Sequence, residues 1–356
     1  MQIGIPKEVK IQEGRVALIP AAAAELVRHG HEVYVQSSAG VASGYSDDEY
    51  EAVGVRLVED AASLYGAAGL IVKVKEPFGS DLDHLNNNHH LFSYLHLAAN
   101  IELMKALQDI GLTAIAFETV EDSTGALPLL APMSDIAGRI AVQTGTFLLH
   151  RPQGGKGILL GGLPAVERGN VVILGAGVAG GNAASVAAAL GANVTVFDRN
   201  RAKLAKMRAL GRNVTALHSF TDSIGQAVAQ ADLVIGAVLV TGERAPVLVN
   251  AETVKTMQEG SVIIDISVDQ GGCIETTRPT SYEAPTFDWE GVVHYGVTNM
   301  PGAVPRSASQ ALSAALVPYV LQLANFGCDS TPELAAGINV RAGDVIHPAL
   351  RTISGV

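Results

Sequence analysis

The chain is poor in the residues that would specify a disulfide framework, a metal centre or a membrane span. Its 356 residues include two cysteines, Cys273 and Cys328, and neither belongs to a CxxC pair or to a His/Cys spacing typical of a metal site. Such cysteine usage fits a reducing compartment. No run of about 18 apolar residues occurs, because polar residues and glycine interrupt the alanine-rich stretch 183–197. We therefore expect no disulfide, no metal ion and no membrane-spanning helix.

Basic residues are also fewer than acidic residues. The chain has 24 Lys and Arg residues against 35 Asp and Glu residues, so its formal net charge is −11 at pH 7 and its pI is near 5.3. This balance argues against binding to nucleic acids or anionic membranes, and an acidic ligand would need a local cationic pocket. The N-terminal stretch turns charged at once and lacks the apolar segment of a signal peptide. We expect a cytoplasmic protein.

Short apolar runs alternate with amphipathic stretches along most of the chain. Runs such as QIGIP and HEVYVQ are separated by helical patterns such as AAAAELVRHG, and a second series of the same kind begins at Val171. The alternation predicts an α/β fold with doubly wound parallel sheets. The hydrophobic content of 48% and the length suit two domains with large cores.

Two features suggest that one domain is inserted in the other. The turn-rich PLLAPM segment near residue 130 forms a boundary, and a long helical stretch, 307–327, follows the second series. We expect a substrate-binding and catalytic domain formed by residues 1–130 and 305–356, and an NAD-binding domain formed by residues 131–304. Within these segments, Ser134 is an expected helix N-cap, and Pro318 is an expected kink or break in the long helix.

A glycine-rich turn carries the clearest motif. The segment VVILGAGVAG runs from an apolar strand into Gly175-x-Gly177-x-x-Gly180, and a helical stretch follows. These glycines allow a tight turn, close approach of the backbone to a pyrophosphate, and close packing of helix on strand. The N-terminus of the helix then offers N–H groups and a positive dipole to the phosphates. The pattern predicts a Rossmann-like dinucleotide-binding domain.

The end of the next strand carries an acid that bears on the choice of cofactor. Asp198 lies 23 residues after Gly175, near the spacing of about 20 expected for a residue that binds the ribose hydroxyls. A carboxylate there favours NAD, because the 2′-phosphate of NADP would meet a like charge. Arg199 and Arg201 leave an alternative open, since an adjacent arginine can accept a 2′-phosphate.

The segment IVKVKEPF, residues 71–78, places two lysines in an apolar stretch. In a strand, Lys73 and Lys75 share one face, and Pro77 ends the run. One interpretation is an edge strand whose lysines face water and discourage edge pairing. The other places Lys75 at the carboxyl end of a strand, where open α/β sheets bind their ligands.

Three further residues suit chemistry, and each also has a structural interpretation. His96 ends an apolar run; histidine transfers protons near neutral pH, but a histidine in such surroundings is often a core residue. Arg15 suits bidentate binding of a carboxylate or a position on the surface. Asp269 follows a predicted strand at the edge where a cofactor would lie, and it also suits a turn before a glycine pair.

Taken together, the motifs resemble the alanine dehydrogenase family, and the likeness covers nearly the whole chain. The matching segments occur in family order: GIPKE, EGRVALIP, KVKEP, YLHLA, AFETVE, LPLLAPMSDIAGR, GGKGILLGG, GAGVAG, ADLVIGAVL, DQGG and NMPGAVPR. The resemblance implies NAD-dependent, reversible oxidative deamination of L-alanine to pyruvate and ammonium by hydride transfer. It also implies a homo-oligomer, expected to be a hexamer, that acts on small molecules.

The resemblance further implies roles for individual residues. Arg15 and Lys75 would hold the carboxylate and the carbonyl oxygen of the substrate, while Lys73 would be structural. His96 would be the acid/base and Asp269 the second catalytic residue, beside the nicotinamide. The implied cofactor-binding residues are Ser134, Gly175, Gly177, Val178, Ala179, Gly180, Asp198, Lys203, Ser219, Val238, Leu239, Arg278 and Asn299.

The nearest alternative of a different class is a transhydrogenase subunit. The soluble NAD-binding subunit of a proton-translocating transhydrogenase shares the expected fold and an RVA-type start, but it passes hydride to a second nucleotide on a partner protein. Such a subunit has no need of a substrate pocket, so the intact KVKEP and YLHLA segments argue against it. Turnover of alanine without a partner protein would separate the two.

Overall fold

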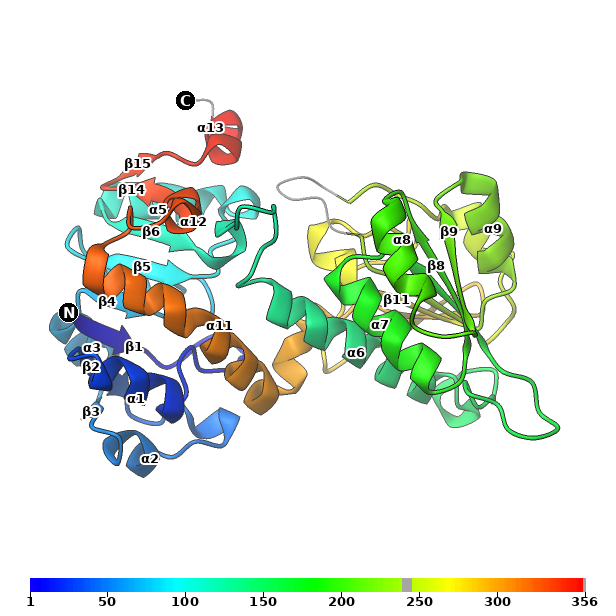
Figure 1. The fold of residues 1–356 in the computed structure, drawn as a ribbon, viewed down its shortest axis with the longest axis horizontal. Helices are drawn as coiled ribbons and strands as arrows, with labels where there is room; N and C mark the ends of the chain where they lie inside the picture. Colours follow the sequence, from blue (N-terminus) through cyan, green and yellow to red (C-terminus); the bar gives the residue numbers. More distant parts are fainter. Residues whose placement is uncertain (239–244, 355–356) are drawn as a thin grey trace. The chain divides into compact units, whose positions relative to one another are not determined.

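The computed structural model describes residues 1–238 and 245–354 (Figure 1). The chain divides into two compact units, Met1–Met133 with Gly302–Val356, and Ser134–Pro301. Each unit has its own mainly parallel β-sheet and helices that connect the strands. The expected α/β class with doubly wound sheets is thus confirmed.

The sheet of the first unit has the strand order β15-β14-β6-β5-β4-β1-β2-β3. Strands β1 to β6 are parallel, whereas β14 pairs antiparallel with β6 and with β15. The order runs outward from β1 in both directions, so the topological switch point, where open α/β sheets bind ligands, lies between β1 and β4. The strands are β1 (Gln2–Ile5), β2 (Glu32–Gln36), β3 (Arg56–Val58), β4 (Leu70–Val72), β5 (His90–Ser93), β6 (Thr113–Ala116), β14 (Ile338–Arg341) and β15 (Asp344–Val345).

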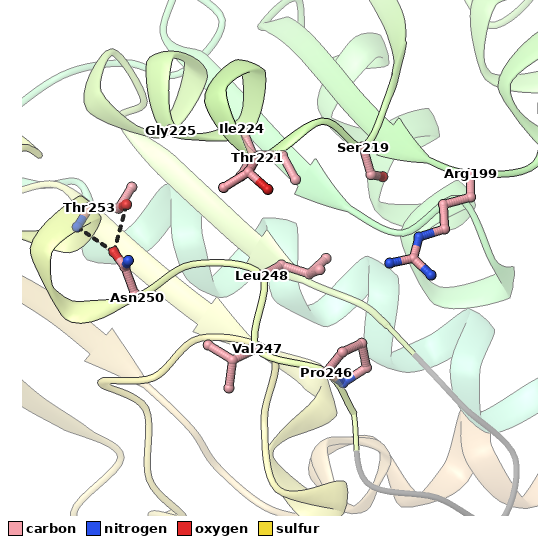
Figure 2. Close-up of a pocket in the computed structure, with 10 residues that line it drawn as sticks. All are labelled: Arg199, Ser219, Thr221, Ile224, Gly225, Pro246, Val247, Leu248, Asn250 and Thr253. Carbon is pink, nitrogen blue, oxygen red and sulfur yellow. Dashed lines mark hydrogen bonds between the residues drawn. The ribbon is translucent and has the colours of Figure 1, made fainter.

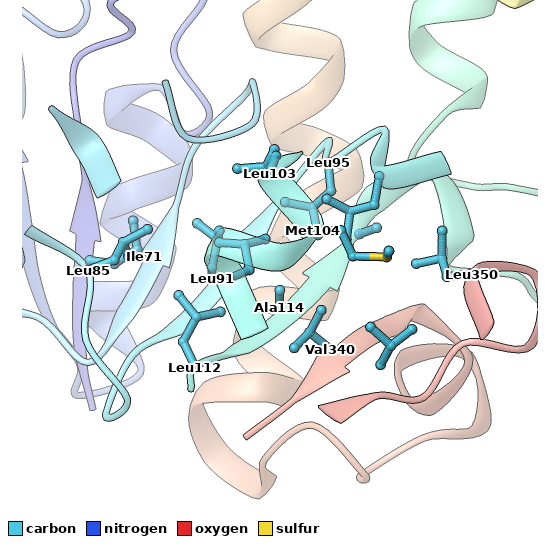
Figure 3. Packing of buried hydrophobic residues seen from close by; sticks show 14 of the residues in the cluster. Ile71, Leu85, Leu91, Leu95, Leu103, Met104, Leu112, Ala114, Val340 and Leu350 are labelled. Carbon is cyan, nitrogen blue, oxygen red and sulfur yellow. The ribbon is translucent and has the colours of Figure 1, made fainter. Parts of the chain in front are cut away.

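Helices and short 3₁₀ turns connect these strands and bury their apolar faces. A core cluster packs β4, β5, β6 and β14 against α3 and α5, with Ile71, Leu91, Met104 and Val340 among its members (Figure 3). The connecting elements are α1 (Pro20–Arg28), η1 (Val41–Ser43), α2 (Asp47–Glu51), α3 (Ala61–Ala67), α4 (Asp81–His84), η2 (Leu97–Ala99), α5 (Ile101–Ile110), η3 (Phe117–Thr119), α11 (Pro305–Phe326), α12 (Pro332–Gly337) and α13 (Pro348–Ser354).

The long helix α11 belongs to the first unit and is fixed to the segment that leads into α1. The hydroxyl of Ser309 accepts a hydrogen bond from Val16 N (2.9 Å), and that of Ser313 donates to Ala17 O (2.9 Å). The helix continues through Pro318, so the expected break is wrong, and a kink at Pro318 remains a prediction. Buried leucines on both sides of Pro318 hold the helix in place, and this packing outweighs the one backbone hydrogen bond that proline removes.

The sheet of the second unit has the order β12-β13-β11-β10-β7-β8-β9, in which β12 is antiparallel to β13. The switch point of this sheet lies between β7 and β10. A core cluster of apolar side chains packs β7, β10 and β11 against α9 and α10. The elements are α6 (Ala131–Leu148), η4 (Arg151–Gln153), β7 (Asn170–Leu174), α7 (Val178–Ala189), β8 (Asn193–Asp198), α8 (Arg201–Arg208), β9 (Val214–His218), α9 (Thr221–Ala229), β10 (Leu233–Gly236), α10 (Ala251–Val254), β11 (Val262–Asp265), η5 (Ile266–Gln270), β12 (Thr286–Trp289), β13 (Val292–Tyr295) and η6 (Met300–Ala303).

The two lysines of the KVKEP segment lie just beyond β4, which is an inner strand paired with β1 and β5. The edge-strand interpretation is therefore wrong. Lys73 is only 1% exposed. Its ammonium lies 2.5 Å from a carboxylate oxygen of Asp81 and 3.7 Å from one of Glu8. The charge is tolerated inside the unit because the carboxylate of Asp81 pairs with it.

We expect Lys73→Met to destabilise the protein by about 3 kcal/mol or more, because Asp81 then remains buried without its cation. Lys73→Met combined with Asp81→Asn removes both charges and should restore most of the lost stability. Thermal and denaturant unfolding followed by circular dichroism will test this. A double variant no more stable than Lys73→Met would contradict the pairing.

Candidate active site

Arg15 is buried in the loop that precedes α1, with 2% of its surface exposed, so the surface interpretation is wrong. Its Nε and Nη2 donate to the two carboxylate oxygens of Glu13, at 2.7 and 2.5 Å, and Nη1 lies 3.0 Å from the sulfur of Met133. Burial works to raise the pKa of Glu13, but hydrogen bonds and the charge of Arg15 outweigh it and lower that pKa. Glu13 thus holds the guanidinium in a fixed orientation.

Lys75 is half-buried at the carboxyl end of the extended segment that follows β4. Burial lowers the pKa of its ammonium, and the nearby charge of Arg15 lowers it further. The two cations are therefore close enough to repel each other. In an acidic protein, two neighbouring cations at a switch point are suited to attract an anion such as a carboxylate.

A buried carboxylate supports the backbone at Lys75. Glu8, in the loop after β1, accepts hydrogen bonds from Val74 N (2.6 Å) and Lys75 N (3.4 Å). Burial raises the pKa of Glu8 to about 7, although the charge of Lys73 and the bond from Val74 act in the opposite direction. The loops after β1 and β4 are thus joined at the switch point by one ionisable group.

His96 lies beyond β5 and has 46% of its side chain exposed, so it is not a core histidine. Its backbone is left-handed, with φ 51° and ψ 35°. Its ring stacks on that of Tyr94, with centroids 5.9 Å apart and planes 6° apart. Tyr94 is buried, and its hydroxyl donates to Leu129 O (2.7 Å). Burial raises the pKa of Tyr94, and the charge of Arg15 opposes the shift. Tyr94 thus stacks on His96 and is close enough to Arg15 to feel its charge, and Arg15 is in turn close to Lys75.

The glycine-rich turn of the second unit has the geometry of a phosphate cradle. Gly175 has a φ of 103°, and a Cβ on Gly180 would lie 1.8 Å from Gly175 O, so these two positions require glycine. A Cβ on Gly177 would meet nothing within 4 Å. Gly177 is also the N-cap of α7 and provides no side chain to cap it. Val178 and Ala179 then form the first turn, whose N–H groups suit an anion.

The residues expected at the ribose and adenine side lie at the ends of β8 and β9. Asp198 accepts hydrogen bonds from Ala176 N and Asn200 N, both at 2.7 Å. Arg199 and Ser219 line one end of a pocket of about 280 Å³, with Asn250 at the other end (Figure 2). Lys203 is exposed in the first turn of α8. The pocket therefore adjoins the acid that the sequence predicts at the ribose.

A buried carboxylate organises the loop that carries Asp269. Asp265, fully buried at the end of β11, accepts hydrogen bonds from Ser267 N, Cys273 N and the hydroxyl of Thr277, each at 2.9 Å. This network fixes both ends of η5. Burial raises the pKa of Cys273, and the Asp265 charge adds to the shift, so Cys273 is a neutral thiol.

Other expected cofactor residues lie around the same loop. The Ser267 hydroxyl accepts a hydrogen bond from Val238 N (3.0 Å), and Asn299 N donates to Asp269 at 3.4 Å. The guanidinium of Arg278 lies over the ring of Phe287, 4.5 Å from its centroid. Leu239 lies outside the described residues.

The expectation for Ser134 as a helix N-cap is wrong. The helix α6 begins at Ala131, so Ser134 lies inside its first turn. One turn later on the same face, a Cβ on Gly138 would lie 2.1 Å from Ala179 O. Ser134 therefore lies on the face of α6 that packs against the start of α7, next to the glycine-rich turn.

Five carboxylate and phenol groups that shape these clusters escaped the sequence analysis: Glu8, Glu13, Tyr94, Glu118 and Asp265. Four of them lie in segments already recognised, GIPKE, EGRVALIP, YLHLA and AFETVE. Their roles depend on backbone amides and cations that come from other strands, and a linear pattern does not show these. The sequence did offer one signal for such residues: an acidic residue at or soon after the end of a predicted strand.

Two sheets of Rossmann order, a phosphate cradle and a cluster of cations at a switch point define a dinucleotide-binding α/β protein. The chain belongs to the alanine dehydrogenase/PNT family: the model of the N-terminal domain matches residues 4–137 and that of the C-terminal domain matches residues 141–348. The resemblance seen in the sequence is confirmed.

Individual relatives agree with this family. The alanine dehydrogenase of Mycobacterium tuberculosis is 48% identical, over 100% of this chain and 97% of its own. A solved structure of an L-alanine dehydrogenase is 50% identical with a TM-score of 0.96, covering 100% of this chain and 99% of that one. The transhydrogenase structure from Sinorhizobium meliloti is 28% identical with a TM-score of 0.85, covering 98% and 100%.

Residues 1–238 and 245–354 contain neither a candidate metal site nor a candidate membrane-spanning helix. Within these ranges, no three or more His, Cys, Asp or Glu side chains are grouped to hold a metal ion. Nor does any helix there combine the length and apolarity needed to cross a membrane.

The raised pKa of Glu8 predicts a pH-dependent stability. The folded protein keeps a proton on Glu8 up to about pH 7, whereas the unfolded chain loses it above about 4.5, so stability falls as pH rises between these values. From pH 5 to pH 8 we expect the free energy of unfolding of the parent to fall by up to about 3 kcal/mol relative to that of Glu8→Gln. The melting temperature of the parent should fall in parallel.

Calorimetry over this pH range will test the prediction. Glu102→Gln, which alters an exposed carboxylate on α5, is the matched control. A constant difference in melting temperature between parent and Glu8→Gln across the range would contradict the prediction.

Proposed function

We propose that the protein is an NAD-dependent alanine dehydrogenase. It converts L-alanine, NAD⁺ and water to pyruvate, ammonium, NADH and a proton, and it catalyses the reverse reaction. The observation that carries the proposal is the cationic site beside β4 in a chain with a net charge of −11, where Glu13 orients the buried Arg15 next to Lys75. Such a site suits a substrate with a carboxylate.

The first unit binds the substrate in this proposal. Arg15, held by Glu13, attracts the carboxylate of alanine or pyruvate. Lys75 contributes the second positive charge and polarises the oxygen that becomes the carbonyl of pyruvate. The lowered pKa of Lys75 makes its ammonium a better hydrogen-bond donor to that oxygen. The neutral methyl group of alanine needs no charged partner.

Proton transfer is assigned to His96 and Asp269. Loss of hydride from Cα leaves an iminium ion, which water attacks to give a carbinolamine, and this collapses to pyruvate and ammonium. Each step needs a base or an acid near the reacting carbon. The half-exposed imidazole of His96, stacked on Tyr94, suits this exchange of protons with solvent. No covalent bond between substrate and protein is required.

The second unit holds the cofactor in this proposal. Gly175, Gly177 and Gly180 form the cradle for the pyrophosphate, and the first turn of α7 supplies N–H groups. Asp198 binds the ribose and selects NAD over NADP. When bound, the nicotinamide supplies the hydride acceptor. The remaining contacts follow the family resemblance: Ser134, Val178, Ala179, Lys203, Ser219, Val238, Leu239, Arg278 and Asn299.

Two further statements about the protein in the cell remain proposals. We infer from the resemblance that it assembles as a homohexamer. We also infer that it acts in the cytoplasm, since its two cysteines are free thiols, as a reducing compartment favours.

We expect purified protein to produce NADH from L-alanine and NAD⁺, measured by absorbance at 340 nm, with far less activity on NADP⁺. Lys75→Ala should lower kcat/KM for alanine by at least about 100-fold, because it removes a charge that stabilises the transition state. NADH binding, followed by fluorescence, should not change. Lys105→Ala, at an exposed lysine of α5, is the control.

Two outcomes would contradict the proposal. A parent that binds NADH but does not oxidise alanine would favour a hydride-transfer subunit like the transhydrogenase. Equal activity of Lys75→Ala and Lys105→Ala would remove Lys75 from the site.

A further inference from the structure

The segments that follow β5 and β6 lie side by side at the carboxyl edge of the first sheet. The two strands are parallel neighbours, and their last residues, Ser93 and Ala116, are paired in register. The chain beyond β5 contains Tyr94, Leu95 and His96. The chain beyond β6 turns into η3, whose middle residue is Glu118.

Glu118 turns its carboxylate toward the backbone of His96. One oxygen accepts a hydrogen bond from His96 N at 2.6 Å and another from Leu95 N at 3.2 Å. The second oxygen lies 3.3 Å from Leu95 N. The side chain of Glu118 is only 17% exposed, and hydrogen bonds to an ionised acceptor are the stronger kind.

These bonds support a backbone conformation that is unfavourable on its own. His96 has a φ of 51°, in the left-handed region that a residue with a Cβ rarely adopts. Such conformations persist where surrounding structure fixes them. Two successive amides, Leu95 N and His96 N, converge on one carboxylate, and this convergence fixes the turn.

The same carboxylate also faces the imidazole. The nearer oxygen of Glu118 lies 3.9 Å from Nδ1 of His96, and the His96 ring also stacks on Tyr94. Glu118 therefore acts on His96 both through the backbone and across space. Glu76 is also near His96: burial acts to raise the pKa of Glu76, but the hydrogen bond from Lys10 and smaller contributions, that of His96 among them, together outweigh it and lower that pKa.

We propose that Glu118 is a positioning residue for His96: its carboxylate fixes the left-handed turn and so directs the imidazole toward the reacting carbon. The inference rests on the proposed function, in which His96 transfers protons. Glu118 does not touch the substrate in this proposal and acts through His96 alone.

The test compares Glu118→Ala and Glu118→Gln with a matched control. Asp122→Ala removes a carboxylate of the same unit that likewise accepts two backbone amides, Thr124 N and Ala126 N, but stands in an exposed turn. We expect Glu118→Ala to lower kcat for alanine oxidation by about 100-fold, within the range for a displaced acid/base group. KM for alanine and affinity for NADH should stay near the parent's values, whereas the melting temperature should fall, because the turn loses the carboxylate that fixes it.

Glu118→Gln keeps an amide oxygen that can accept from His96 N, so it should retain activity within about 10-fold of the parent. Both substitutions are also made in a His96→Ala background. A residue that acts only through His96 adds no further loss there, because the effects of groups that act as a unit are not additive. We expect less than about a 2-fold change in kcat between His96→Ala and the double variants.

The inference is overturned if Glu118→Ala lowers kcat no more than Asp122→Ala, or if its loss multiplies with that of His96→Ala. If Glu118→Ala fails to fold, Glu118→Gln and its double variant decide by the same criteria. Failure of the proposed function is distinguishable, since the parent itself would then not oxidise alanine.

Discussion

The first unit depends on the pairing of buried cations with carboxylates. Arg15 and Lys73 are 2% and 1% exposed, and an unpaired charge at such depth would be strongly destabilising. Glu13 and Asp81 lie within hydrogen-bond distance of these cations. The first unit can therefore bury two cations although the overall charge of the chain is negative.

Lys75 is in a different electrostatic environment from Arg15 and Lys73. Its backbone N–H bonds to Glu8, but its ammonium is influenced by Arg15, Lys10, Glu76 and Glu13 together. The cation that we assign to the reacting oxygen is thus the one that is half-buried and has a lowered pKa. In the proposed function the buried Arg15 attracts the substrate carboxylate, Lys75 polarises the reacting oxygen, and Lys73 remains structural.

Parallel-sheet topology explains how such distant residues meet. The carboxyl ends of neighbouring parallel strands lie along one edge, so the loops after β1, β4, β5 and β6 bring Glu8, Lys75, His96 and Glu118 together. The second sheet repeats the arrangement at β7 and β10, where Gly175 approaches Ala237 closely. In both sheets the candidate site residues lie at or near the point where the chain order reverses.

The sequence revealed the elements whose signals are local. The glycine spacing after an apolar strand predicts the turn between β7 and α7, and alternating apolar runs predict the α/β class. Lys73 was harder to place, because its burial depends on Asp81 and Glu8, which lie on other segments. The continuity of α11 through Pro318 and the start of α6 at Ala131 likewise depend on tertiary packing, which overrides local propensity.

The most direct test of the account is the fate of the hydrogen on Cα of the substrate. Purified protein is given L-alanine deuterated at Cα together with NAD⁺, and the NADH formed is analysed by mass spectrometry. The account predicts NADH that carries one deuterium, with pyruvate formed in equal amount. NADH without deuterium, or pyruvate formed without NADH, would contradict direct hydride transfer from alanine.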